Sequence, residues 1–306
     1  MKQRSNLIIA LSGGPDSVYL FHHLLAQHHS KQITLRAVHV NHGWRDSAAD
    51  DEQFCRDLCT QHNIPLTVAH AADWQHRVPA HKSKNSSPES LAREIRRVIF
   101  AHEHATHNAD AVVLAHHRDD QLETFFIRLL RGASLSGLCG MQPRADIYLR
   151  PLLDVSKTEI LSWLAEHNHT YCHDETNDSA AHLRNRIRQQ VLPALTSADA
   201  RAPHTITNTM KRLKDDDDFL AQLTNDLIAE LRDEGGQLPR ETFCQLHSAL
   251  QHRILLQLFI AARAPIVPTS ALLAEVIRFL SSPNGGRHEI APGVAIVKQR
   301  GFFSVV

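Results

Sequence analysis

The sequence predicts an α/β fold, in which a parallel sheet has helices on both faces and is followed by a smaller, mainly helical C-terminal domain. Two observations favour this fold. Short apolar runs alternate with stretches of helical spacing over the first 115 residues, and the alternation stops after Arg150. Such alternation is typical of a parallel sheet covered on both faces. The 306 residues, 42% of them hydrophobic, are enough to build two cores.

Four apolar runs rich in branched residues are the expected strands, over residues 7–11, 34–40, 65–69 and 111–115. The segments between them carry apolar residues at helical spacing, as in Val18, Phe21 and Leu24. In such sheets ligands bind beyond the carboxyl ends of the strands. We therefore expect the functional site among the residues that follow each run.

The pattern changes after Arg150, where Ser156 is the expected N-cap of a helix over residues 156–167. The polar stretch 193–203, with a proline at each end, is the expected boundary between domains over 1–195 and 205–306. Residues 205–280 are expected to be helical, and residues 288–306 to form short strands. The run 215–218 holds four aspartates, whose side chains would point in different directions on a helix. This run predicts a solvated helix segment, not a metal site.

Composition excludes several classes of protein. The 33 basic and 33 acidic side chains cancel, so any nucleic-acid surface must be a local patch. Five cysteines without a C-x-x-C pair indicate a reducing compartment, and Cys55 and Cys59 are expected to be ordinary helix residues. No apolar run approaches the roughly 20 residues of a membrane span, and residues 1–5 lack the apolar core of a signal peptide. A cytoplasmic protein without a membrane partner is expected.

A hexapeptide with the character of a phosphate-binding loop separates the first expected strand from the first expected helix. It consists of Ser12, Gly13, Gly14, Pro15, Asp16 and Ser17. Two glycines permit a tight turn, so that backbone N–H groups and the helix N-terminus converge on an anion. The hydroxyl groups add donors, and Asp16 is a candidate Mg²⁺ ligand. Ordinary turns use the same residue types, but the position after a buried strand favours phosphate. The loop has neither a Walker ending nor G-x-G-x-x-G spacing.

Polar side chains also follow the fourth expected strand. Asp120 and Glu123 are three residues apart on an expected helix and therefore share a face at the sheet edge. Such a pair can bind an ammonium group, position Mg²⁺ or take a proton from an amine. Helix capping is the alternative for Asp119 and Asp120. His116 is a candidate for contact with phosphate or with the activated base, and packing in the core is its alternative.

Val40 and His42 end the second expected strand, where an adenine or a ribose can lie against the backbone. Basic side chains form three local groups. These are Arg93, Arg96 and Arg97; Arg184, Arg186 and Arg188; and His76, Arg77, His81, Lys82 and Lys84. On a neutral chain, such groups predict RNA contacts placed by position, although for Arg96 a merely solvated position is equally expected.

The hexapeptide resembles the pyrophosphate-binding loop of the N-type ATP pyrophosphatases, or PP-loop superfamily, which split ATP into AMP and pyrophosphate while activating an oxygen as its adenylate. Five more segments follow in order: residues 115–124, AHHRDDQLET; 131–132, RG; 150–154, RPLLD; 174–177, DETN; and 184–188, RNRIR. Together they look like the tRNA(Ile)-lysidine synthase family. The specific motifs cover about the first 190 residues, and the helical C-terminal part matches more loosely.

The resemblance implies an adenine nucleotide alpha hydrolase-like sheet that uses ATP with Mg²⁺. The implied reaction joins free L-lysine to carbon 2 of the wobble cytidine, position 34, of tRNA(Ile) with a CAU anticodon. It passes through an adenylated intermediate and yields lysidine, AMP and pyrophosphate. The implied catalytic residues are His116, Asp120 and Glu123. The implied tRNA-binding residues are Arg93, Arg97, Arg131, Arg184, Asn185, Arg186 and Arg188, together with the C-terminal helical domain.

The sequence departs from the family pattern in two ways. Arg97 stands where members commonly have a tyrosine after their A-R-E-x-R segment. Many members also continue into a further C-terminal domain, so the contacts that hold the tRNA body are less defined than those that bind ATP. Two alternatives remain open. A tRNA thiolase of the same superfamily would be expected to bring a C-x-x-C pair, and a non-catalytic adenine-nucleotide-binding module would not need the complete acidic and arginine motifs. The oligomeric state, a homodimer included, is open.

Overall fold

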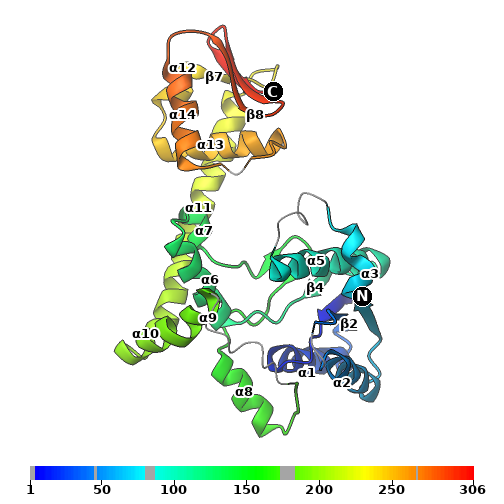
Figure 1. Cartoon of the computed structure of the whole chain (residues 1–306). Helices are drawn as coiled ribbons and strands as arrows, with labels where there is room; N and C mark the ends of the chain where they lie inside the picture. Colours follow the sequence, from blue (N-terminus) through cyan, green and yellow to red (C-terminus); the bar gives the residue numbers. More distant parts are fainter. Residues whose placement is uncertain (1–3, 45–46, 80–86, 173–182, 267) are drawn as a thin grey trace. The chain divides into compact units, whose positions relative to one another are not determined.

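The computed structural model describes residues 4–44, 47–79, 87–172, 183–266 and 268–306 (Figure 1). The chain forms two compact units, unit 1 from Met1 to Lys211 and unit 2 from Arg212 to Val306. They divide inside helix α11 (Ala202–Leu231), close to the polar stretch in which the boundary is predicted. The domain limits themselves, 1–195 and 205–306, stay a prediction.

Unit 1 is built on a six-stranded sheet with the strand order β3-β2-β1-β4-β6-β5. Its strands are β1 (Ser5–Ala10), β2 (Ile33–Asn41), β3 (Leu66–His70), β4 (Ala111–Val113), β5 (Arg144–Ala145) and β6 (Tyr148–Leu149). Neighbouring strands are parallel except for β5 and β6. The four expected strands are confirmed. The β5–β6 pair was not expected, because two-residue strands are too short to show a period.

Successive residues of β1 face opposite sides of this sheet, as the pleat requires. Leu7 and Ile9 pack with one set of helices, and Ile8 packs with another. Figure 1 shows helices on both faces of the sheet. The first set is α1 (Pro15–His29), α2 (Ala48–Gln61) and α8 (Lys157–Glu166), and the second is α3 (Ala71–Trp74) and α5 (Pro88–Thr106). The parallel sheet with helices on both faces is therefore confirmed. Cys55 and Cys59 are buried in α2, as expected of ordinary helix residues.

Further helices complete unit 1. They are η1 (Gln75–Arg77), α6 (Arg118–Leu130), α7 (Leu135–Leu138), α9 (Leu183–Arg186), η3 (Ile187–Val191) and α10 (Leu192–Ala198). The expected serine cap is confirmed, because Glu159 N–H donates to Ser156 Oγ at 3.1 Å and Ser156 N–H donates to the Glu159 carboxylate at 2.7 Å. This capping box fixes where α8 begins.

Unit 2 has helices and a small antiparallel sheet in the order β7-β10-β9-β8. Its elements beyond α11 are β7 (Leu238–Pro239), α12 (Arg240–Gln245), α13 (Ser248–Ala261), α14 (Ser270–Ser281), β8 (Gly286–Ala291), β9 (Val294–Gln299) and β10 (Phe302–Val305). Phe243, Phe259 and Phe303 lie in its core. The terminal strands are confirmed, whereas β7 interrupts a segment that was expected to be helical.

The four aspartates at 215–218 lie on α11, and the prediction of a solvated helix segment fits three of them, which are exposed. Asp217 differs, because Arg253 donates to its carboxylate at 2.6 Å.

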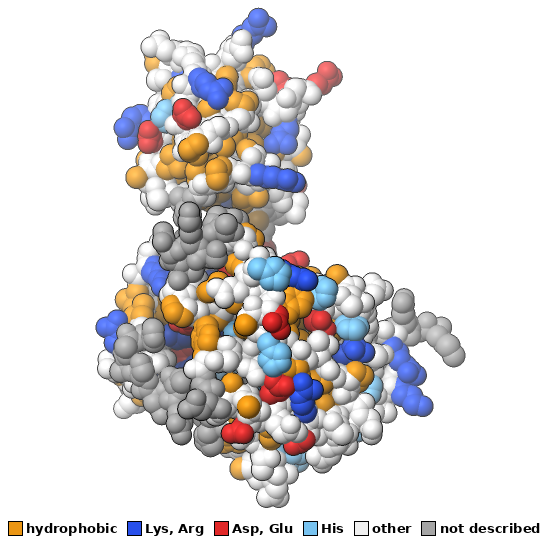
Figure 2. Space-filling model, turned by 45° about the vertical axis from the view of Figure 1, so that its right-hand side comes forward, with side chains coloured by type: hydrophobic (Ala, Val, Ile, Leu, Met, Phe, Trp, Pro, Cys, Tyr) orange, Lys and Arg blue, Asp and Glu red, His pale blue; other side chains and the backbone are white. Residues whose placement is uncertain are grey.

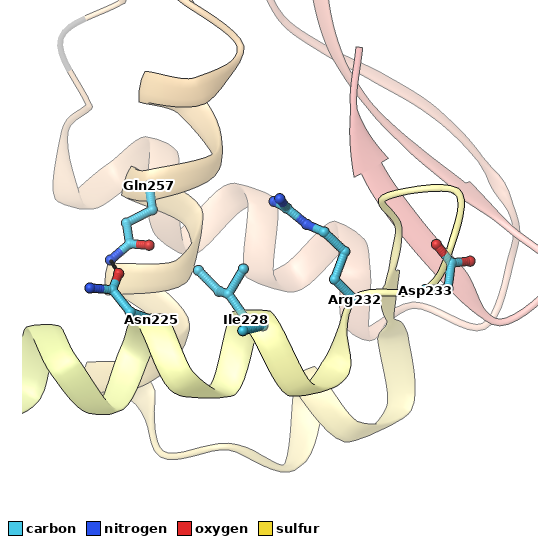
Figure 3. Close-up of a pocket in the computed structure, with 6 residues that line it drawn as sticks. Asn225, Ile228, Arg232, Asp233 and Gln257 are labelled. Atoms are coloured by element: carbon cyan, nitrogen blue, oxygen red, sulfur yellow. Dashed lines mark hydrogen bonds between the residues drawn. The ribbon is translucent and has the colours of Figure 1, made fainter.

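Near the end of helix α11, Asn225, Ile228 and Arg232 line a cavity of about 330 Å³ (Figure 3). None of the helices in the described ranges is both long and apolar enough to cross a membrane.

Candidate active site

The hexapeptide forms the turn between β1 and α1, at the carboxyl end of the central strand β1. Gly13 has a φ of +85°, a value that favours glycine. A Cβ atom at Gly13 would lie 3.2 Å from Cys172 Sγ and 3.5 Å from Cys55 Sγ. The Cys172 N–H also donates to the Gly13 carbonyl oxygen at 2.9 Å. The tight turn therefore depends on glycine both for its backbone angle and for its packing.

Hydroxyl groups stabilise this loop from inside. Ser17 Oγ donates to the Gly14 carbonyl oxygen at 2.9 Å and accepts from the Ser12 N–H at 3.2 Å. Pro15 occupies the first turn of α1, where its missing N–H costs no hydrogen bond. The N–H groups of Asp16 and Ser17 lie in the same turn, in which a helix leaves N–H groups without intrahelical partners. This arrangement suits an anion.

A buried histidine, His117, lies among three carboxylates beside the loop. Its Nε2 atom is 3.7 Å from Asp16 Oδ2 and 3.6 Å from Asp120 Oδ2, and its Nδ1 atom is 3.5 Å from Asp119 Oδ2. Burial acts to lower the pKa of His117, but Asp119, Asp120 and Asp16 together hold that pKa above its ordinary value. Between the phosphate loop and α6, His117 therefore takes up a proton more readily than a free imidazole does.

Lys157 connects the same loop to α8. Its Nζ atom donates to Asp16 Oδ1 at 2.5 Å, and its backbone N–H donates to Asp119 Oδ2 at 2.9 Å. Burial acts to raise the pKa of Asp119, but the contacts with His117 and with the Lys157 N–H outweigh it and keep the pKa below its ordinary value. Sequence reasoning missed both His117 and Lys157. The only available signals were the H-H-x-D-D run for His117 and the position after a helix cap for Lys157.

The acidic pair and two arginines contact one another. Arg184 Nε donates to Glu123 Oε2 at 2.6 Å, and Arg188 Nε donates to Glu123 Oε1 at 2.5 Å. Arg184 also reaches Asp120 Oδ1 at 3.4 Å. The side chain of Glu123 is 0% exposed, while that of Asp120 is 15% exposed. Asp120 also caps α6 by accepting the His117 N–H at 3.0 Å. Both oxygens of Glu123 are therefore taken by arginines, whereas Asp120 keeps some access to solvent.

His116 lies next to these groups, and its Nδ1 atom is buried without a hydrogen-bond partner in the described part of the chain. Burial lowers the pKa of His116 to about 4; Asp120 opposes this shift, and the charges of Arg150, Arg184 and Arg93 add to it. His116 and His117 are thus adjacent in sequence but shifted in opposite directions. The two imidazoles of this site therefore differ in how readily each takes up a proton.

The expected adenine or ribose contacts lie at the end of β2. Val40 is in β2, and His42 follows it with its ring 5.1 Å from that of Trp44. Burial and the charge of Arg96 lower the pKa of His42 to about 4. His39, which precedes Val40 in β2, contacts the Leu11 carbonyl oxygen at 2.9 Å through its Nδ1 atom. The end of β2 is therefore tied to the end of β1, where the loop begins.

Other expected tRNA-binding residues take no part in the contacts that join Asp120 and Glu123 to Arg184 and Arg188. Arg97 lies 3.7 Å from Glu94 on α5 and is 54% exposed. Arg131 ends α6, and Arg186 is exposed on α9. Asn185 is partly buried on α9. Residues 81, 82, 84 and 174–177, which belong to predicted motifs, lie outside the described residues.

Asp16 is the expected metal ligand, and it is a single carboxylate. Across the described ranges, no group of three or more histidine, cysteine or acidic side chains has the geometry to hold a metal ion. A metal at Asp16 would therefore need oxygen ligands from a bound phosphate group, a coordination that Mg²⁺ commonly adopts.

Comparison with known proteins shows the family. A model of the PP-loop domain matches residues 1–195. A tRNA(Ile)-lysidine synthase from Chlamydia abortus is 32% identical over 242 residues, which are 76% of this chain and 72% of that protein. The chain belongs to the tRNA(Ile)-lysidine synthase family. The family enzyme from Nitrosomonas europaea is 34% identical over 92% of this chain.

The match to longer family members is partial. The chain spans 60% of the length of the Nitrosomonas europaea enzyme and 62% of that from Bacillus anthracis. Among solved structures, a U34-tRNA thiolase, NcsA from Methanococcus maripaludis with its [4Fe-4S] cluster, superposes with a TM-score of 0.57. It is 21% identical and the match covers 69% of this chain and 73% of that one, so the likeness is one of fold.

Proposed function

We propose that this chain ligates free L-lysine to carbon 2 of the wobble cytidine of tRNA(Ile) with a CAU anticodon, through an adenylated intermediate, and releases AMP and pyrophosphate. Membership of the tRNA(Ile)-lysidine synthase family supports this reaction. One structural observation supports it most directly. Beyond the ends of β1 and β4, His117 contacts both Asp16 of the phosphate loop and Asp120, and Asp120 in turn contacts Arg184. The strand order reverses between these two strands, which is where open α/β sheets bind ligands.

ATP fits the loop because Gly13 leaves room for the backbone turn and the first N–H groups of α1 are available for phosphate oxygens. Asp16 would hold Mg²⁺ together with those oxygens, since Mg²⁺ is usually bound through one or two carboxylates plus phosphate. When bound, ATP supplies the adenylyl group that converts the cytidine oxygen into a leaving group. Val40 and His42 would lie along the adenosine.

Asp120 is the carboxylate we assign to lysine, as a partner for its ammonium group or as the acceptor of its proton. It is close to His117 and Arg184 and retains solvent access. Glu123, which the sequence predicted in the same role, is completely buried and bound by Arg184 and Arg188. We therefore assign Glu123 as a positioning residue for the two arginines. His116, held neutral, would donate or accept a hydrogen bond at the activated base.

The tRNA would contact basic side chains around this site and the C-terminal domain. Arg93 lies within electrostatic reach of His116, and Arg131 and Arg186 are exposed. Arg97 and Asn185 are further candidates. A cytoplasmic location agrees with the cysteine pattern, and a homodimer is one of the oligomeric states that sedimentation would distinguish.

The decisive test is pyrophosphate release measured with ATP, lysine and a tRNA(Ile) transcript. We expect adenylation to require the CAU transcript, and complete turnover to require lysine as well. A transcript with uridine in place of the wobble cytidine is the matched control and should be inactive. Release that ignores the tRNA would contradict the proposal, and so would sulfur transfer to the transcript, which would indicate the thiolase alternative.

A further inference from the structure

The phosphate loop contains no cation of its own. Its six residues include neither lysine nor arginine, although the triphosphate they would bind carries several negative charges. Backbone N–H groups and a helix N-terminus supply only partial charges. A full positive charge at this place must therefore come from another part of the chain.

Two basic side chains lie within 4 Å of the Asp16 carboxylate in the described part of the chain, and the charge of Arg188, which is bound to Glu123, also interacts with Asp16. His117 is 4% exposed and its Nε2 atom is 3.7 Å from the carboxylate, so it has little freedom to reach a ligand. Lys157 Nζ is 2.5 Å from Asp16 Oδ1, and its side chain is 34% exposed. An ammonium group has three N–H donors, of which the contact with Asp16 uses one. Lys157 therefore has donors left for an anion that enters from solvent.

The backbone at Lys157 is fixed, while its side chain is long and flexible. Lys157 is the first residue of α8, directly after the capping box of Ser156 and Glu159. Its N–H is held by Asp119, which belongs to the first turn of α6. Two helices that begin at the sheet edge thus fix the base of a side chain whose tip lies at the phosphate loop.

We propose that Lys157 is the phosphate ligand that the loop lacks, and that it binds the β- and γ-phosphates of ATP and the pyrophosphate product. Without nucleotide its charge is balanced by Asp16. When the nucleotide binds, the Asp16 carboxylate would bind the metal ion and the Lys157 ammonium group would donate to a phosphate oxygen. The inference rests on the proposed use of ATP, and it adds a residue 141 positions away from the loop in sequence.

The test is a calorimetric titration of the full chain with inorganic pyrophosphate, ATP and AMP. K157Q should weaken binding of pyrophosphate and of ATP by roughly 10- to 100-fold, because a hydrogen bond to a charged group is lost. Binding of AMP, which lacks the β- and γ-phosphates, should change little, and its retention shows that the site is folded. K157R should restore part of the loss. K211Q, which removes a lysine that pairs with Asp154 at 2.7 Å on the surface of unit 1, is the matched control and should behave like the parent.

A second comparison separates direct contact from simple neutralisation of Asp16. In a D16N background and in buffer without Mg²⁺, K157Q should still weaken pyrophosphate binding. If K157Q has an effect only when Asp16 is present, Lys157 merely balances that carboxylate and the inference is wrong. Equal pyrophosphate affinity of K157Q and the parent also overturns it, while leaving the proposed function intact. A parent chain that binds neither ATP nor pyrophosphate overturns both.

Discussion

At the scale of single residues, the site depends on which partner each titratable group has. His116 and His117 are adjacent, yet burial lowers the pKa of His116, whereas three carboxylates outweigh burial and raise the pKa of His117. The same contrast distinguishes Asp120 from Glu123. Asp120 has a partly exposed carboxylate beside His117, whereas Glu123 is buried with one arginine on each oxygen. Side chains of the same chemical class thus take different roles because their surroundings differ.

Glu123→Gln tests the positioning role. It removes the charge that holds Arg184 and Arg188, so we expect the free energy of unfolding to fall by about 1–3 kcal/mol and lysine transfer to fall with it. Asp120→Asn is the matched change, and it should lower lysine transfer while costing less stability. Urea unfolding of both variants, together with transfer assays, measures the difference. An unchanged unfolding midpoint for Glu123→Gln would return this residue to a direct role in the chemistry.

Gly13→Ala separates backbone strain from close packing. The new Cβ would add strain at a φ of +85° and a contact of 3.2 Å with Cys172 Sγ. Gly132→Ala is the control, because Gly132 has a φ of +71° with no atom near the added Cβ. We expect Gly132→Ala to cost about 1 kcal/mol of stability and Gly13→Ala to cost more and to lose ATP binding. Equal destabilisation in urea would mean that the sulfur contact plays no part.

At the scale of elements, helices α1, α2 and α8 share a group of histidines: one lies midway along α1, and the others follow the C-terminal ends of α2 and α8. His22 on α1 stacks on His169, which follows α8, with ring centroids 3.6 Å apart, and His62 follows α2. These rings and Asp57 line a cavity of about 350 Å³. Burial lowers the pKa of His22 to about 4, and the charges of His169, His62 and His167 add to the shift.

This lowered pKa predicts acid sensitivity of the packing between these helices. The ordinary pKa of histidine lies near 6.5, so the unfolded chain binds a proton at His22 before the folded chain does. The contribution to stability is complete above pH 6.5 and is lost as the pH falls from 6.5 towards 4. His22→Gln should flatten the pH dependence of the unfolding temperature in this window, by a few degrees. His23→Gln, at an exposed neighbour on α1, should leave it unchanged; equal curves for the parent and His22→Gln would refute the prediction.

At the scale of the whole molecule, the proposed RNA recognition would have to come from local charge, because the chain has no net charge. On the face that Figure 2 shows, Lys, Arg, Asp, Glu and His side chains are interspersed on the larger unit. Of the three arginines predicted to contact phosphates beyond residue 183, Arg184 and Arg188 are paired with Glu123. For Arg186, no carboxylate partner is recorded in the described ranges. Arg186 is therefore the one whose charge is available to a phosphate in this state of the chain.

Arg186→Ala should lower the affinity for tRNA and reduce the log–log salt slope by about one unit. Arg201→Ala is the control, because Arg201 is exposed but bound by Asp199 at 3.0 Å. Filter binding of tRNA(Ile) over a series of salt concentrations measures both slopes. A slope that Arg186→Ala leaves unchanged would place Arg186 outside the RNA contact.

The sequence by itself determined the fold class, the phosphate loop and the family. Each of these depends on residues that are contiguous in the chain, such as an apolar run or the glycine pair at Gly13 and Gly14. Patterns of contiguous residues can be detected in a single sequence. It also indicated that Asp16, His116 and Asp120 would lie at one edge of the sheet, because parallel strands end together. Unit 2 was predicted only in outline, since two-residue strands such as β7 have no period to detect.

Only the tertiary structure decided how the charged side chains are paired. Glu123 pairs with Arg184 and Arg188, which are 61 and 65 residues away in the sequence. Asp16 pairs with Lys157, which is 141 residues away. Residue spacing shows which side chains reach an edge of the sheet. It does not show which acidic side chain there pairs with which basic one, because several pairings have the right charges. The choice among them depends on where α6, α8 and α9 begin and on how deeply each carboxylate is buried, and these are set when the elements pack together.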